Sequence, residues 1–122
     1  STVQRTSNFG MWMGNNNVEA GEVRVHCGVT SPSIGWQAYT SSRNIRNGWH
    51  HVACVYNQAT GRQTMYIDGV QDATTSSATD GTTGAGTNIW VGIEGTPPAG
   101  RMLTGTIDEV RILNVARSMT TA

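Results

Sequence analysis

The sequence predicts an all-β fold, a sandwich of two antiparallel sheets. Strand-length runs recur along the chain, several of them alternate apolar and polar residues, and Gly, Asn, Pro and Ser residues separate them. No stretch of ten or more residues shows the 3.6-residue periodicity that amphipathic helices require. The 122 residues contain no internal repeat or linker, so we expect a single domain over residues 1–122.

The first part of the chain, after a polar opening, contains three predicted strands. In the second of them, alternation places the valines and Cys27 on one face, inward, and Arg24 and His26 on the other, outward. Turn-forming residues follow the first two strands, with Gly and Asn at 14–17 and a Ser-Pro-Ser break at 31–33. The predicted strands are residues 9–13, 22–29 and 34–40.

Residues 49–56 predict the central strand of a sheet. This stretch contains no Gly, Pro or formal charge, and both of its alternate faces carry apolar groups. Apolar groups on both faces are typical of a strand that is covered on both sides. We therefore expect Trp49, Val52 and Ala53 to belong to the core.

Three further strands are predicted in the second part. Asp68 and Gly69 give the strongest hairpin signal, because a type I′ turn favours this pair. Residues 73–86 are rich in Thr, Ser, Gly and Ala and predict a long exposed loop. The predicted strands are residues 62–67, 88–93 and 104–114, the last followed by one helical turn over residues 115–119.

Three segments carry a resemblance to a known family. Residues 49–53 (Trp-His-His-Val-Ala), 65–69 (Met-Tyr-Ile-Asp-Gly) and 105–114 (Gly-Thr-Ile-Asp-Glu-Val-Arg-Ile-Leu-Asn) occur in this order. Their order and spacing resemble the laminin G-like modules of the concanavalin A-like lectin/glucanase superfamily and, more distantly, pentraxins. The resemblance implies a jelly-roll sandwich.

The chain departs from that family pattern before residue 9. Modules of this kind carry further strands there, including one that pairs with the final strand. One interpretation is an N-terminally truncated or processed fragment. The other is that a neighbouring chain supplies the strand, because an open edge beside residues 104–114 invites pairing. The second interpretation predicts self-association or assembly.

Two cysteines, Cys27 and Cys54, lie on predicted strands with apolar neighbours. If both point into one core they can form a disulfide, which favours an extracellular setting. The alternative is two free buried thiols that behave as small apolar side chains.

The acidic and histidine residues do not form a recognisable catalytic set. Asp108 and Glu109 are adjacent, so on a strand they point to opposite faces and cannot act together as glycosidase carboxylates. His50 and His51 are also on opposite faces, and His26 is on another strand. We therefore expect no enzymatic activity, and histidines that are buried or hydrogen-bonded.

Calcium is the one cofactor that the resemblance suggests. Glu94 stands where the pentraxin pattern places a calcium carboxylate, and Asp72 and Asp80, on or beside the long loop, could add oxygen ligands. The acidic continuation after Glu94 is replaced by Gly and Thr, so solvated loop carboxylates are the alternative.

Aromatic side chains near amides are the candidates for ligand binding. They are equally the largest apolar groups available for the core. The candidate residues are Trp12, Trp36, Tyr39, Trp90 and Asn88.

Composition narrows the function further. The formal net charge is zero and 13% of residues are charged, which argues against nucleic-acid binding and against attachment to an anionic membrane. No apolar run approaches the length of a membrane span. Two functions remain: an extracellular recognition or adhesion module that binds glycan or protein through rim loops, and a structural subunit of a virion or cell surface completed by its neighbour.

Overall fold

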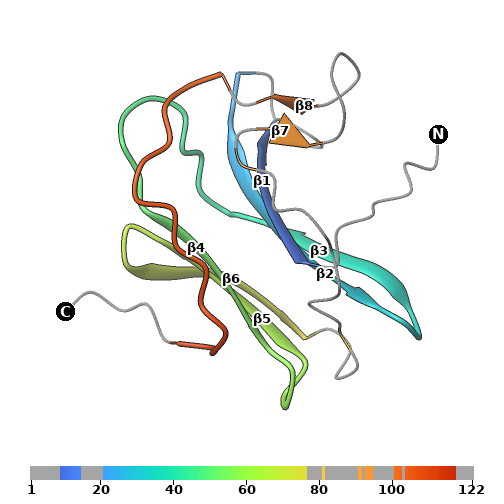
Figure 1. Ribbon diagram of the computed structural model, residues 1–122. Helices are drawn as coiled ribbons and strands as arrows, with labels where there is room; N and C mark the ends of the chain where they lie inside the picture. The colour runs from blue at the N-terminus through green and yellow to red at the C-terminus, as the bar shows by residue number, and fades with distance from the viewer. Residues whose placement is uncertain are drawn as a thin grey trace.

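The computed structural model describes residues 9–14, 21–76, 81, 91, 93–94, 101–102 and 104–117 (Figure 1). Described residues form strands, turns and extended segments, and none of them is helical. Accordingly, no helix within these ranges is long and apolar enough to span a membrane. The strands are β1 (Phe9–Gly14), β2 (Arg24–Ser31), β3 (Gly35–Thr40), β4 (Val52–Asn57), β5 (Arg62–Ile67), β6 (Val70–Ser76), β7 (Ile93–Glu94) and β8 (Arg101–Met102).

Two three-stranded antiparallel sheets face each other as two layers (Figure 1). The first has the order β1-β2-β3 and the second the order β4-β5-β6, while β7 and β8 form a separate antiparallel pair. This arrangement confirms the predicted all-β sandwich of two antiparallel sheets.

The core lies between the two sheets. Its fully buried members come from alternate positions of β2 and β5, because a strand turns every second side chain to the same face. The disulfide between Cys27 and Cys54 joins β2 to β4, with their Cα atoms 5.9 Å apart. The core cluster consists of Val25, Cys27, Ile45, Met65 and Ile67.

The turn between β5 and β6 is the predicted two-residue hairpin. Asp68 and Gly69 have φ angles of 53° and 77°, as a type I′ turn requires, and Ile67 pairs with Val70 across it. The prediction from the Asp-Gly pair is therefore confirmed.

The central strand is β5, and the prediction that residues 49–56 form it is wrong. Strand β4 begins only at Val52 and lies at the edge of the described sheet. Asn47 and Gly48 adopt positive φ angles just before it, and Trp49 is 71% exposed instead of buried. The chain turns here because Asp68 and His51 bond reciprocally: Asp68 N–H donates to His51 O at 2.8 Å, and His51 N–H to Asp68 Oδ1 at 3.0 Å.

The prediction of a loop over residues 73–86 is also wrong for its first four residues, because β6 extends to Ser76. Gly81 is buried, and a Cβ atom there would lie 2.3 Å from the Tyr56 hydroxyl. The rest of this loop lies outside the described residues. So does most of the predicted strand at 88–93, of which Ile93 belongs to β7 and Val91 to a bend.

The predicted final strand is not a strand in this structure. Residues 104–117, called segment 104–117 below, form no ladder and no helical turn, and all of them are exposed. In Figure 1 the segment runs alongside β4. Its strand-like alternation is therefore present in the sequence, but no described strand pairs with it.

Candidate functional site

The structure gathers two predicted ligand residues, Trp12 and Trp36, on one face of the first sheet. Trp12 on β1 pairs in register with His26 on β2, and their rings stack with centroids 5.3 Å apart and planes inclined by 6°. Trp36 on β3 lies 5.6 Å from Trp12, tilted by 34°. Alternation places this cluster on the face that points away from the second sheet.

The close packing of the cluster depends on Gly28. A Cβ atom at this position would lie 2.4 Å from Trp36 Cζ2, so no other residue leaves room for that ring. His26 is on the outward face as predicted, yet it is only 4% exposed, and its Nδ1 lies 2.9 Å from Thr40 Oγ1. One face of the Trp12 ring is therefore already occupied by His26.

Tyr39, a third predicted ligand residue, packs against the core between the sheets. Burial raises the pKa of its phenol, and the charge of a nearby Tyr66 phenolate raises it further. A buried, neutral tyrosine at this place supports packing. Trp90 and Asn88 lie outside the described residues, so their ligand roles stay predictions.

The predicted calcium ligands are not brought together in the described part of the chain. Glu94 belongs to β7 and pairs with Arg101, and Asp80 lies outside the described residues. No group of three or more His, Cys, Asp or Glu residues within the described ranges is placed to hold a metal. Calcium binding stays a prediction.

His50 is hydrogen-bonded, one of the two states expected from the sequence. Its Nδ1 lies 2.8 Å from Asp68 Oδ2 and its Nε2 lies 3.2 Å from Asn47 O. This hydrogen bond between the two side chains raises the pKa of His50 and lowers the pKa of Asp68. This pair fastens the turn at 47–51 to the β5–β6 hairpin.

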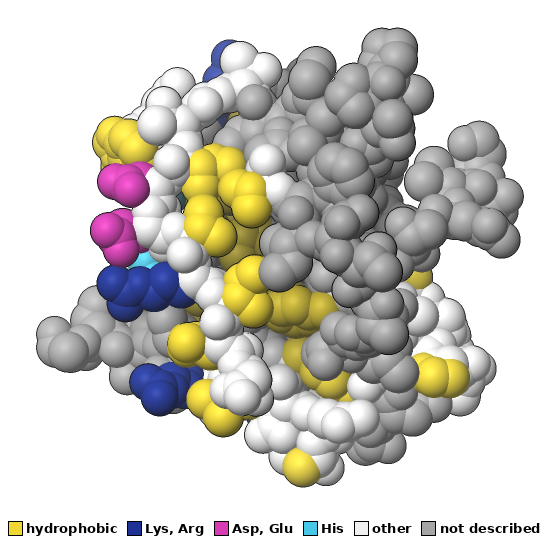
Figure 2. Space-filling view, viewed as in Figure 1, with side chains coloured by type: hydrophobic (Ala, Val, Ile, Leu, Met, Phe, Trp, Pro, Cys, Tyr) yellow, Lys and Arg dark blue, Asp and Glu magenta, His cyan; other side chains and the backbone are white. Residues whose placement is uncertain are grey.

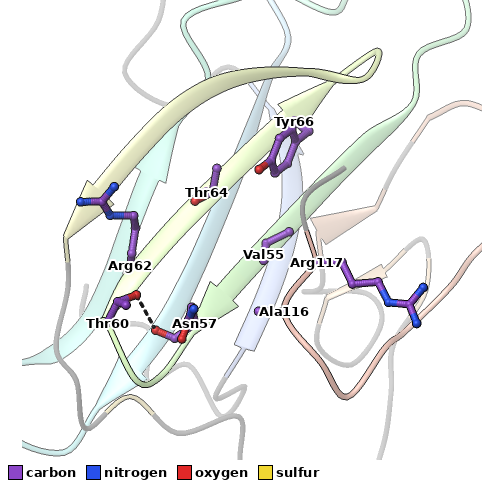
Figure 3. A pocket seen from close by; sticks show the side chains of 8 residues that line it. All are labelled: Val55, Asn57, Thr60, Arg62, Thr64, Tyr66, Ala116 and Arg117. Carbon is purple, nitrogen blue, oxygen red and sulfur yellow. Dashed lines mark hydrogen bonds between the residues drawn. The ribbon is translucent and has the colours of Figure 1, made fainter. Parts of the chain in front are cut away.

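A pocket of about 490 Å³ lies on the face of β4 and β5 that points away from the core (Figure 3). The register places Val55 opposite Thr64 and Asn57 opposite Arg62, so their side chains share this face. Segment 104–117 supplies the facing wall. The lining residues are Val55, Asn57, Thr60, Arg62, Thr64, Tyr66, Ala116 and Arg117.

The lining combines hydrogen-bonding groups with apolar surface. Amide, hydroxyl and guanidinium groups line the pocket together with the ring of Tyr66 and the side chain of Val55, and none of these eight described residues carries a carboxylate or an imidazole. Figure 3 shows the guanidinium groups of Arg62 and Arg117 pointing in opposite directions, so they do not form a joint anion clamp.

Sequence reasoning did not identify this pocket. Alternation in residues 62–67 puts Tyr66 on the face of the strand opposite to Met65 and Ile67, and β5 has this arrangement. The same alternation places Arg62 and Thr64 on the face of Tyr66, and this was a sequence signal for a polar binding surface on that face. The wall at Ala116 and Arg117 comes from residues about 50 positions away and has no local sequence signal.

Comparisons with known proteins agree with this architecture. A laminin G family model, described as the concanavalin A-like lectin/glucanases superfamily, matches residues 2–121. Neither a search of curated proteins nor a search of solved structures found a match. The match covers nearly the whole chain, and the two facing antiparallel sheets are those of a concanavalin A-like sandwich. The chain therefore belongs to the concanavalin A-like lectin/glucanases superfamily.

Proposed function

We propose that this protein is a non-enzymatic recognition module that binds a saccharide in the pocket on β4 and β5. The observation that carries the proposal is the pocket itself, about 490 Å³ in volume and lined by polar side chains and one tyrosine. The pocket lies in a protein with a lectin-like fold, and membership of this superfamily supports a ligand-binding role in general. A protein ligand at the rim loops is the alternative occupant.

The lining suits a sugar ring chemically. Saccharide hydroxyls both donate and accept hydrogen bonds, and the Asn57 amide together with the Thr60 and Thr64 hydroxyls offers both functions. Arg62 adds donors only. The apolar C–H face of a sugar fits against an aromatic ring, and Tyr66, which is 7% exposed, is the aromatic residue among the lining residues.

A binding role without catalysis fits the same residues. Hydrolysis of a glycosidic bond uses a pair of carboxyl groups on either side of that bond. None of the described residues that line this pocket is Asp or Glu, so the lining they form lacks the pair of carboxyl groups that most glycosidases use.

The test is a glycan array of neutral and sulfated oligosaccharides, followed by NMR titration of the ¹⁵N-labelled protein with the best binder. Asn57→Ala and Arg62→Ala should each raise the Kd about tenfold or more, since each removes hydrogen bonds to the ligand. Arg111→Ala is the matched control, because Arg111 is exposed and outside the pocket. Unchanged binding in both pocket variants would refute the site, and an array without binders would favour a protein ligand.

Two further expectations belong to this proposal. The Cys27–Cys54 disulfide supports an extracellular or surface location, because such bonds persist in oxidising compartments. Calcium remains the cofactor to test, with Glu94 and Asp80 as its candidate ligands. Isothermal titration with calcium that gives neither heat nor a shift in Tm would remove it.

A second candidate function is that of a structural subunit that assembles through an open edge. The observation in its favour is segment 104–117, which no described strand pairs with. It exposes five large apolar side chains by 43% to 64% (Figure 2). Such a surface on a strand-like segment is typical of an interaction site.

A further inference from the structure

Two turns in which Asn or Asp precedes Gly, residues 47–48 and 68–69, are linked through the imidazole of His50. All four turn residues have positive φ angles, between 53° and 85°. We propose that Asn47 is a site of spontaneous deamidation, with the Gly48 nitrogen as the nucleophile, and that the product carries a carboxylate beside His50. The second turn, at Asp68, is protected from the corresponding reaction. The site lies outside the saccharide pocket.

Asparagine is a chemically labile residue, and its deamidation needs no reagent other than water. The backbone nitrogen of Gly48 loses its proton and attacks Cγ of Asn47. A C–N bond forms, the bond from Cγ to Nδ2 breaks, and ammonia leaves with the proton. Water then opens the resulting succinimide ring at either of its two carbonyl carbons. One opening gives aspartate at position 47, and the other gives isoaspartate, in which the main chain runs through the former side chain.

The local structure leaves both reacting groups accessible. Asn47 and Gly48 are exposed and form a bend ahead of β4. Glycine has no Cβ atom, so no side chain hinders the approach of its nitrogen to Cγ. Within the described residues, Asn47 is hydrogen-bonded through its carbonyl oxygen, and neither its carboxamide nor the Gly48 N–H is bonded. The attack therefore requires no hydrogen bond of the described chain to break.

Asn44 and Asn57 differ from Asn47 in both respects, because a residue with a side chain follows each of them. The carboxamide oxygen of Asn44 accepts two backbone N–H bonds, from Val23 at 3.0 Å and Arg46 at 2.9 Å. That of Asn57 accepts the N–H of Ala59 at 3.1 Å. These bonds hold each carboxamide in place and oppose its rotation toward the next nitrogen. The two asparagines are therefore internal controls.

Asp68 is also followed by glycine, but its carboxylate is held. Its Oδ2 lies 2.8 Å from His50 Nδ1, and its Oδ1 accepts the N–H of His51 at 3.0 Å. Both hydrogen bonds favour the ionised form and lower the pKa of Asp68. Ring closure from an aspartate proceeds through the protonated carboxyl group, because a carboxylate is a poor electrophile. The two turns thus have similar backbones and differ in the reactivity of the side chain.

Deamidation changes the surroundings of His50. Its Nε2 lies 3.2 Å from the carbonyl oxygen of Asn47. In isoaspartate this oxygen becomes part of a free carboxylate, and in aspartate the new carboxylate is on the side chain of the same residue. The other charged groups that act on the imidazole are the Asp68 carboxylate and the Arg43 guanidinium. A second carboxylate favours the imidazolium, so deamidation should raise the pKa of His50 further.

The test is incubation of the intact protein at neutral pH and physiological temperature, followed by reduction, chymotrypsin digestion and mass spectrometry. Chymotrypsin cuts after aromatic residues and releases residues 40–49, a peptide that contains both Asn44 and Asn47. Asn47 should deamidate about tenfold faster or more than Asn44 and Asn57, the ratio expected when one hydrogen bond has to break first. Electron-transfer fragmentation distinguishes isoaspartate from aspartate, and a sample without incubation corrects for reaction during digestion.

Two variants identify the reacting groups. Gly48→Ala adds a methyl group beside the nucleophile, where no atom lies within 4 Å of the added Cβ, and should slow the reaction. Its φ angle of 85° strains an alanine, so circular dichroism melts check that this variant folds. Asn47→Asp keeps a residue that tolerates positive φ and is the standard for one product. NMR titration of the imidazole should give a higher pKa for His50 in this variant and in the incubated wild type than in the fresh wild type.

An Asn47 that stays intact, or that reacts no faster than Asn44, overturns the proposal whether or not the alanine variant folds. An undiminished rate in folded Gly48→Ala overturns the assignment of the nucleophile. Isoaspartate at position 68 overturns the protection of that turn. An unchanged His50 pKa in the deamidated protein overturns the placement of the new carboxylate. Saccharide binding is tested separately by the pocket variants.

Discussion

At the scale of single residues, His50 shows how one side chain couples a turn to a hairpin. Both of its ring nitrogens face acceptors, the Asp68 carboxylate and the Asn47 carbonyl. Only the doubly protonated imidazolium can donate to both. The positive charge of Arg43 opposes this and lowers the pKa of His50, but the hydrogen bond with Asp68 dominates and raises it.

The consequence is a pH-dependent stability. Because the pKa of His50 is raised above 6.5 in the folded protein, its contribution is complete below that pH and is lost as pH rises through the folded pKa. Asp68, with a pKa lowered from 3.8, contributes above that pH and loses its contribution as pH falls through the folded pKa. The pair therefore stabilises the turn most in the mildly acidic range between these limits.

We predict that the free energy of unfolding, and with it Tm, decreases between about pH 6 and about pH 9. The decrease in free energy should be less than about 1 kcal/mol, because the pair is largely solvent-exposed. His50→Gln should remove this part of the pH dependence. His51→Gln is the control, because His51 contacts Asp68 through its backbone. Thermal melts by circular dichroism measure the effect, and identical pH profiles for wild type and His50→Gln would contradict it.

At the scale of elements, Asp72 on β6 holds the loop that follows β3. Its side chain is 2% exposed and accepts hydrogen bonds from Ser42 N–H at 2.6 Å and Ser42 Oγ–H at 2.8 Å. The guanidinium Nε of Arg43 lies 3.4 Å away, and Arg43 also donates to the carbonyl of Ile67. One carboxylate thus fixes the chain between the two sheets.

We predict that Asp72→Ala lowers the free energy of unfolding by about 1–3 kcal/mol, because it removes the acceptor of several donors at once. Ser42→Ala should cost less, since the backbone donor and Arg43 remain. Urea denaturation measures both changes. Equal losses in the two variants would show that the serine hydroxyl, not the carboxylate as a whole, is the important partner.

Elements also show how far local patterns reach. Alternation identified the buried face of β2, and the Asp68–Gly69 turn fixed the register of β5 with β6. Alternation could not place β4 at an edge, because the neighbours of a strand are chosen by long-range pairing. Apolar groups on both faces of residues 49–56 were therefore mistaken for complete burial.

At the scale of the whole molecule, the disulfide joins the two sheets. Cys27 and Cys54 are 27 residues apart, and cross-linking a loop of this size is worth about 3–4 kcal/mol on the chain-entropy model. The Cys27→Ala/Cys54→Ala double variant should lose about that much free energy of unfolding.

Urea denaturation with and without reductant measures this loss. Reductant should lower the stability of the wild type and leave the double variant unchanged. Two titratable thiols in the untreated, denatured wild type would show that the bond is absent and that the cysteines are the free pair allowed by the sequence.

The sequence by itself determined the all-β class, the buried face of β2, the hairpin at Asp68 and the superfamily. The first three follow from local rules, since alternation and turn chemistry operate over a few residues, and the superfamily follows from the order of three motifs along the chain. Only the tertiary structure decided that Trp49 is exposed, that segment 104–117 lacks a described partner strand, and that Asn57 and Arg117 line the same pocket. Each of these depends on which distant segments come together, and that choice is made by the packing of the whole chain.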